Sequence, residues 1–437
     1  MKFTRLALAL AATFAAGSAC SADLAAVYKD ARVSDPVYQA ARAQYQATTE
    51  RLPQARSGYL PQLAATASIF RNHGERDGIA DRDYSTKTIG VTLSQPVFRL
   101  QNWIAIDQAH NLVLQAESVL ASSLQDLALR VSQAYFDVLL ARDNVALSET
   151  QKTAIDQQLA QAKRNFEVGT ATIVDTLDAQ ARYDTAVAKA IADKNDLEVK
   201  VRALQVLLGK VPEGLTPLKE PLTLAPPTPN DIEAWVKTAA DSSFTVAVAK
   251  ANLDIAQQEV ARQRAGHLPT VDLSGSVARI DDPGSTVPPI SPVSRVGSIG
   301  LTLSIPIFTG GLVQSRVREA VALRDRAEQD LENAQRNVAQ SVRSSYLNVT
   351  SGIALVRALE QAQVSTQSQL DSTILGRDVG VRTSVDVLNA QQAVFQTRRD
   401  LQQARYNYLL NTLRLKAAAG QLTETDVEEV SRSLSRG

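Results

Sequence analysis

The sequence has 437 residues, enough for two or three domains, and 44% of them are hydrophobic although only 5% are aromatic. Such sparse aromatic content points to long helices with slender side chains rather than to ordinary globular cores. Lysine and arginine number 46, as do aspartate and glutamate, and this balance excludes a nucleic-acid partner held by a strongly basic surface.

The N-terminus has the layout of a secretory signal peptide. Two basic residues precede an apolar stretch over 6–16, and small residues follow. Cleavage after Ala22 predicts a signal peptide over 1–22 and a mature chain over 23–437. No later apolar run reaches 18 residues, so we expect no helical membrane span.

The single cysteine leaves a second interpretation of this region open. The stretch "GSAC" resembles a lipoprotein processing site in which Gly17 replaces the usual leucine, and lipidation of Cys20 is therefore the alternative to cleavage after Ala22. With one cysteine, disulfides and cysteine-based metal sites are excluded in either case.

Two segments near the start of the mature chain alternate apolar and small polar residues. This period of two predicts β-strands over about 61–71 and 87–97, because successive side chains of a strand point to opposite faces. The apolar positions are Leu63, Ala65, Ala67 and Ile69 in the first segment and Ile89, Val91 and Leu93 in the second.

A long helix and a hairpin follow these strands. No proline lies between Pro96 and Pro212, as an uninterrupted helix requires. The motif "VGTATIVDTLDAQ" at 168–180 then supplies a glycine after the helix and an acidic residue shortly beyond it. Glycine at a helix C-terminus and an acid near the next N-terminus predict a helix-turn-helix hairpin.

The second half of the chain repeats this order after a proline-rich segment at 211–235. Strands are expected over about 269–279 and 297–307, and no proline follows Pro306. A second long helix then reaches the motif "VGVRTSVDVLNAQ" at 379–391.

The two hairpin motifs match at eight positions separated by 211 residues, which predicts two tandem structural repeats. Their expected bounds are about 23–210 and 231–420. The segment 211–235 connects the repeats and overlaps the start of the second, and 421–437 follows the second repeat.

The strands have one apolar and one small polar face, which is the pattern of a transmembrane β-barrel, and a soluble sheet packed on a helix is the alternative. Four strands cannot close on themselves, and open edges are not tolerated in lipid. Several chains must therefore share the barrel. Two chains would give eight strands around a filled interior, and three would give twelve around an open lumen.

Together these features make the sequence similar to the TolC family of outer-membrane efflux and secretion ducts. The resemblance rests on the signal peptide, the paired strand entries and exits, the two "VG" hairpins, "DLAAVYKDARVSDP" at 23–36 and "ARYNYLLNTLRLKAAAG" at 404–420. It covers essentially the whole mature chain.

The resemblance implies a mixed α/β membrane protein of Gram-negative bacteria. Three chains would form a homotrimer with a twelve-stranded transmembrane β-barrel in outer-membrane lipid, four strands from each chain, continued by a long α-helical barrel in the periplasm. The segments 211–235 and 421–437 would form a mixed equatorial region. The duct would be a passive exit for a tripartite efflux pump or a type I secretion system.

The partners implied are a periplasmic adaptor, also called a membrane fusion protein, and an inner-membrane transporter of the ABC or RND type. The hairpin tips would contact the adaptor. The tip residues are Val168, Gly169 and Thr170 in the first hairpin and Val379, Gly380 and Val381 in the second. The alternative for the two glycines is that they serve only as helix C-caps.

By the same resemblance, the second hairpin lines a gate at the periplasmic entrance. Arg382 stands where the first repeat has Ala171, and it would tether the second hairpin to the first near Thr172 and Asp175. Asp386 would form a ring around the constriction.

Two further gate positions depart from the family pattern, and the acids have a simpler alternative role. Asn389 replaces a second ring carboxylate, and Arg377 stands where a tethering tyrosine is expected. Asp175, Asp178 and Asp386 would alternatively do no more than stabilise helix N-termini, by about 0.3 to 1 kcal/mol each.

We expect no enzymatic activity, cofactor or metal. The three histidines, His73, His110 and His267, lack ligand spacing, and no phosphate loop or nucleophile motif is present. A periplasmic adaptor or other coiled-coil protein of the envelope is the alternative function. It would share the helical hairpin, but it would lack four strands patterned for lipid.

Overall fold

The computed structural model describes residues 23–76, 79–284 and 292–434. The expected signal peptide and Cys20 lie outside these residues. The chain divides into two compact units: Met1–Gln39, Leu124–Trp235 and Val342–Gly437 form the first, and Ala40–Ser123 and Val236–Ser341 form the second. Two long helices contribute residues to both units.

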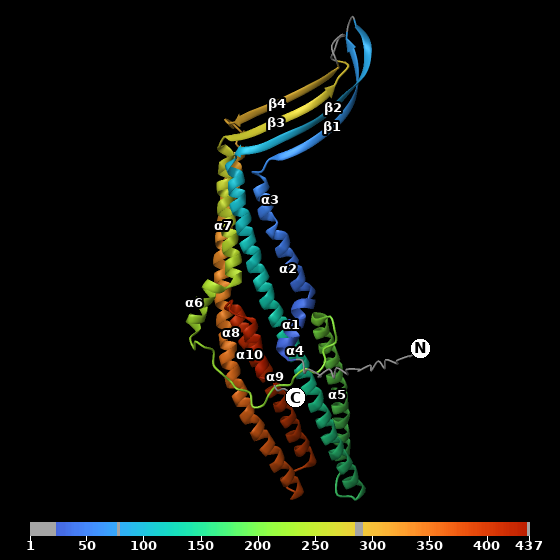
Figure 1. The fold of residues 1–437 in the computed structure, drawn as a ribbon. Helices are drawn as coiled ribbons and strands as arrows, with labels where there is room; N and C mark the ends of the chain where they lie inside the picture. The colour runs from blue at the N-terminus through green and yellow to red at the C-terminus, as the bar shows by residue number, and fades with distance from the viewer. Residues whose placement is uncertain (1–22, 77–78, 285–291, 435–437) are drawn as a thin grey trace, which may run out of the picture. The chain divides into compact units, whose positions relative to one another are not determined.

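The second unit contains a four-stranded antiparallel sheet, drawn at the top of Figure 1, in which the strands follow chain order. The strands are β1 (Gln62–Arg76), β2 (Ile79–Phe98), β3 (Thr270–Asp281) and β4 (Val293–Ser304). In register, Val91 lies between Ala65 and Val277, so the apolar positions of neighbouring strands share one face. The alternation in the sequence therefore corresponds to a two-faced sheet.

The apolar face of this sheet lacks a cover from the described part of the chain. Six large apolar residues on it are between 66% and 80% exposed: Leu63, Ile69, Ile89, Val277, Ile299 and Leu301. The opposite face carries serine, threonine and glycine, and the hydroxyls of Ser276 and Ser298 lie 2.9 Å apart across β3 and β4.

The strand ends differ from those expected from the pattern. β1 continues beyond residue 71, and β2 begins before residue 87, because the ladder extends through pairs such as Asn72 with Tyr84. The Asn72 side-chain amide also donates to the Thr86 hydroxyl at 2.8 Å. β4 begins at Val293 and stops at Ser304, two residues before Pro306, which has no N–H to donate to a ladder.

The sheet joins its helices through an aromatic and ionic cluster in the second unit. The Tyr59 ring lies 4.5 Å from the Trp103 ring, and the Tyr59 hydroxyl donates to the Arg99 carbonyl at 3.1 Å. The Arg99 guanidinium in turn pairs with Asp272 of β3 at 2.9 Å.

Helices make up most of the remaining described chain. α4 (Leu100–Glu167) has 68 residues and α8 (Leu312–Asp378) has 67, so each is about 100 Å long at 1.5 Å per residue. Each turns back into a shorter helix, α5 (Ile173–Leu208) and α9 (Ser384–Ala418) respectively. The others are α1 (Leu24–Ser34), α2 (Pro36–Thr49), α3 (Arg51–Ser57), α6 (Ile232–Ser242), α7 (Phe244–Arg264), the 3-10 turn Ala265–His267 and α10 (Glu424–Arg432).

Within the first unit, the segment 211–235 is held by hydrogen bonds from tyrosines at equivalent places in the two repeats. Tyr135 is fully buried and donates to the Thr216 carbonyl at 3.0 Å, whereas Tyr346 donates to the Asn230 side chain at 2.8 Å. A β-bridge between Leu218 and Leu434 joins this segment to the tail after α10. The two segments that the resemblance assigns to the equatorial region therefore contact each other.

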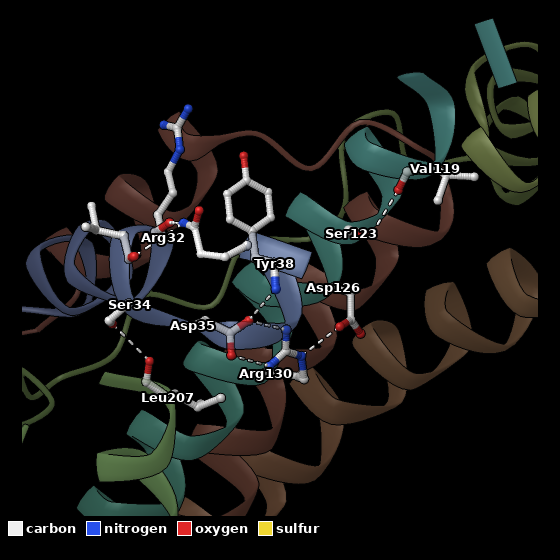
Figure 2. Close-up of polar contacts among 11 residues, drawn as sticks. Arg32, Ser34, Asp35, Tyr38, Val119, Ser123, Asp126, Arg130 and Leu207 are labelled. Carbon is white, nitrogen blue, oxygen red and sulfur yellow. Dashed lines mark hydrogen bonds and ion pairs between the residues drawn. The ribbon is translucent and has the colours of Figure 1, made fainter. Parts of the chain in front are cut away.

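An ion pair with a buried carboxylate fixes the junction of α1 and α2 against α4 (Figure 2). Asp35, at the junction of α1 and α2, is 1% exposed and lies 2.9 Å from Arg130. The Asp35 carboxylate also accepts the Tyr38 N–H at 2.9 Å, which caps the first turn of α2.

Candidate functional site: the two hairpin tips

The turn between α4 and α5 and the turn between α8 and α9 have the same backbone geometry. Gly169 and Gly380 adopt positive φ angles of 77° and 83°. In the first turn the Thr170 N–H donates to the Asn165 carbonyl at 2.8 Å, and in the second the Val381 N–H donates to the Gly376 carbonyl at 2.8 Å. These are the hydrogen bonds of a glycine-terminated helix, and positive φ explains the choice of glycine.

The tip residues project into open space. Val168, Val379 and Val381 are 72%, 67% and 75% exposed. A Cβ atom added to Gly169 or Gly380 would meet no atom within 4 Å. Each tip therefore presents apolar side chains that the described chain leaves uncovered.

A capping box begins each returning helix. The Thr172 hydroxyl accepts the Asp175 N–H at 3.2 Å while Asp175 accepts the Thr172 N–H at 2.9 Å, and Thr383 and Asp386 repeat this at 3.1 and 2.9 Å. The hydrogen bonds from the Thr172 hydroxyl and N–H lower the pKa of Asp175. Both carboxylates are therefore engaged at helix N-termini within their own hairpins.

The pKa of Asp386 is lowered as well. The Thr383 backbone N–H and hydroxyl contribute most, and the positive charge of Arg382 acts in the same direction. Within the described residues Arg382 forms no ion pair, and it has no hydrogen bond to Thr172 or Asp175. Its side chain lies against Gly376 instead.

Arg377 connects the second hairpin to the first. Its guanidinium donates to Gln158 of α4 at 3.3 Å and pairs with the neighbouring Asp378 at 2.7 Å. Its side chain is only 18% exposed.

Asn389 is held by a residue that the sequence interpretation missed. Arg182 of α5 donates to the Asn389 side chain at 2.8 Å and to Gln392 at 3.3 Å, and Asp178 lies exposed one turn before Arg182. The signal that singled out Arg382, a charge where the other repeat has alanine, would have found Arg182, because its counterpart is Ala393.

Apolar packing also joins the hairpins in this region. Leu388 of α9 is buried with residues of α4 and α5: Ile155, Leu159, Ala162, Ala179 and Ala186. Farther from the tips, Arg399 pairs with Asp193 at 3.2 Å. The structure thus brings Arg377, Arg182 and Asn389 into contacts between the hairpins, and it places Arg382, Asp175 and Asp386 in contacts within each hairpin.

The described residues contain no cluster of three His, Cys, Asp or Glu side chains that could hold a metal ion. In the same part of the chain, no helix is both long enough and apolar enough to cross a membrane.

Comparison with known proteins gives matches along nearly the whole chain. The family model described as outer membrane efflux protein matches residues 27–210 and 235–421. Outer membrane protein TolC of Vibrio cholerae is 34% identical over 413 residues, covering 94% of each chain. The alkaline protease secretion protein AprF of Pseudomonas aeruginosa is 30% identical and covers 94% of this chain and 87% of its own. The solved structure of CusC has a TM-score of 0.80 at 19% identity and covers 92% of both chains.

Proposed function

We infer the function of this chain from its membership of the outer membrane efflux protein family, to which it plainly belongs. It is an outer-membrane protein that serves as an exit duct for efflux or type I secretion. One observation carries this conclusion: the likeness to TolC spans the sheet and both helical hairpins, and is not confined to one element.

We propose that three chains share one barrel of twelve strands. Two features support this proposal. The strand order leaves β1 and β4 with one neighbour each, and the apolar face of the sheet is exposed. Pairing β4 of one chain with β1 of the next would remove every edge, as lipid requires. Twelve strands leave a lumen, whereas eight would be filled by side chains.

The duct we propose is passive and performs no chemistry. The relatives are named as outer-membrane and secretion proteins, and their names describe no enzymatic activity. Energy would come from an inner-membrane transporter of the ABC or RND type, joined to the duct by a periplasmic adaptor. The exposed valines at both tips favour an apolar contact with that adaptor.

We propose that the second hairpin also forms the gate at the periplasmic entrance. Asp386 and Arg382 supply opposite charges at the start of α9, and Arg377 and Arg182 hold the second hairpin to the first within one chain. Because Arg382 and Asp175 make no hydrogen bond within the described part of the chain, their contact would form between neighbouring chains or when the gate closes.

A deletion and complementation experiment tests the function. Cells lacking the gene should lose export of drugs or of a secreted protein, and a plasmid copy should restore it. The protein should sediment with outer-membrane markers on a sucrose gradient. Recovery in the soluble periplasmic fraction, with export intact in the deletion strain, would overturn the proposal.

A further inference from the structure

Gly376 occupies a position where glycine has no conformational reason to be. It lies in the last turns of α8 and, unlike Gly380, does not have a positive φ angle. Alanine is favoured over glycine inside a helix. Gly376 is also buried, although its neighbour Leu375 is 65% exposed.

The side chain of Arg382 lies closest to the place that a Cβ atom at position 376 would take, and Val381 Cγ2 is next at 3.5 Å. A Cβ atom at position 376 would lie 2.8 Å from Arg382 Cγ and 3.4 Å from Arg382 Cβ. The Arg382 backbone cannot easily retreat, because its N–H donates to the Gly376 carbonyl at 3.1 Å. A side chain at 376 would therefore force the arginine stem to rotate away.

The first hairpin provides an internal comparison. Its turn has the same pair of backbone hydrogen bonds, with Asn165 at the position of Gly376 and Ala171 at the position of Arg382. The large and the small side chain are thus exchanged between the repeats. The backbone turn itself does not require glycine at this place.

We propose that Gly376 is a positioning residue for Arg382: it provides a side-chain-free seat for the arginine stem and so holds the guanidinium in one orientation at the start of α9. A long exposed arginine otherwise samples many rotamers, and the seat restricts them. The inference rests on the proposed gate function of the second hairpin and adds a second residue to it. Gly376 and Arg382 act as a unit that the first hairpin lacks.

The test compares Gly376→Ala, Arg382→Ala and the double variant by single-channel conductance in planar bilayers. Alanine favours the helix, so Gly376→Ala should assemble normally. We expect Gly376→Ala to raise the conductance severalfold, to the level of Arg382→Ala. The double variant should give that same conductance with no additional increase, because both substitutions disrupt the same contact between Gly376 and the Arg382 side chain.

Gly352→Ala is the matched control. Gly352 is another glycine of α8, and a Cβ there would meet only Tyr408 Cβ at 3.9 Å, an ordinary contact. The conductance of the Gly352→Ala channel should equal that of the wild type. Wild-type conductance for Gly376→Ala, or additive increases in the double variant, would overturn the role of Gly376. Failure of the wild-type protein to form any channel would instead contradict the proposed function.

A second readout follows the charge itself. The proposed ring of Asp386 carboxylates would bind a multivalent cation only when the carboxylates are ionised. Displacing Arg382 removes a positive charge that helps to lower the pKa of Asp386, so half-block of the channel by such a cation should occur at a higher pH in Gly376→Ala. A general loosening of the helix end would leave that pH unchanged, and so would Gly352→Ala. If the pH of half-block is unchanged in Gly376→Ala, the proposed role of Gly376 in positioning Arg382 is contradicted.

Discussion

Asp35 shows how one buried carboxylate fixes the N-terminal helices to the long helix α4. Burial raises its pKa, but the hydrogen bonds from Arg130 and from the Tyr38 N–H outweigh this, and its pKa lies below the usual value. The folded state therefore prefers the charged form more strongly than the unfolded chain does. The stability that this preference contributes is complete above the unfolded pKa of about 3.9 and is lost as the pH falls through the folded pKa.

Replacing Asp35 by asparagine should lower the free energy of unfolding by about 1.5 to 3 kcal/mol at neutral pH, the range for a hydrogen bond to a charged group. It should also flatten the fall in melting temperature below pH 4. Thermal melts in detergent followed by circular dichroism check both effects.

Asp126→Asn is the matched control. Asp126 pairs with the same Arg130, but its side chain is 59% exposed. Its removal should change stability by at most about 0.5 kcal/mol, as for other exposed pairs one helical turn apart. Equal effects of the two substitutions would contradict the importance of the buried pair.

Arg382 is the residue whose charge we expect to hold the entrance closed. Arg382→Glu would place a second carboxylate beside Asp386 and remove the proposed tether, so single-channel conductance should rise severalfold. Ala171→Glu, at the equivalent place in the first hairpin, should change it far less. Unchanged conductance in a correctly assembled Arg382→Glu protein would mean that the closed state is held elsewhere.

At the scale of the element, the hairpin tip combines a required turn with an exposed surface. Gly380→Trp should abolish export, because the bulky ring would fill the open space in which the adaptor is proposed to dock. Gly380→Ala has the same unfavourable φ, worth about 1 to 2 kcal/mol, but adds little volume. Export assays with both variants separate the two effects: loss of export in both would show that only the turn matters.

The strands offer a second test at this scale. Ile299 is 80% exposed on the apolar face near the middle of β4, and Ser298 points to the opposite face. Arginine on the lipid face near the membrane midplane should destabilise the barrel by about 2 to 4 kcal/mol. Ile299→Arg should therefore reduce the heat-resistant assembled form on a gel, whereas Ser298→Arg should assemble and alter ion selectivity. The opposite result would reverse the proposed lipid and lumen faces.

The sequence predicted those elements whose physical signal is local. Alternation indicated four strands, and the long tracts without proline indicated two long helices, because a period of two and an unbroken helix each leave a direct record. The strand ends were less predictable: the pairing of Asn72 with Tyr84 depends on cross-strand contacts, not on alternation.

The candidate site was predictable only in part, for a similar reason. The glycines and capping acids of the tips follow from turn chemistry, which the repeat makes visible. The link from Arg182 to Asn389 joins residues 207 positions apart, and the seat of Arg382 on Gly376 depends on side-chain direction. Neither is encoded in spacing along the chain.

At the scale of the whole molecule, the account depends on several chains completing what one chain leaves open. A single chain has two sheet edges with one neighbour each, an apolar face without cover in its described residues, and two hairpins whose tips are exposed. A shared twelve-stranded barrel would remove the edges and direct the apolar face to lipid.

Native mass spectrometry of the purified mature protein in detergent tests this claim most directly. The account predicts a dominant species of three times the mass of the mature chain. That species should persist when collision energy strips the detergent, because in the shared barrel each chain would be hydrogen-bonded to two neighbours through β-ladders. A stable monomer or dimer as the only species would contradict the shared barrel and, with it, the duct.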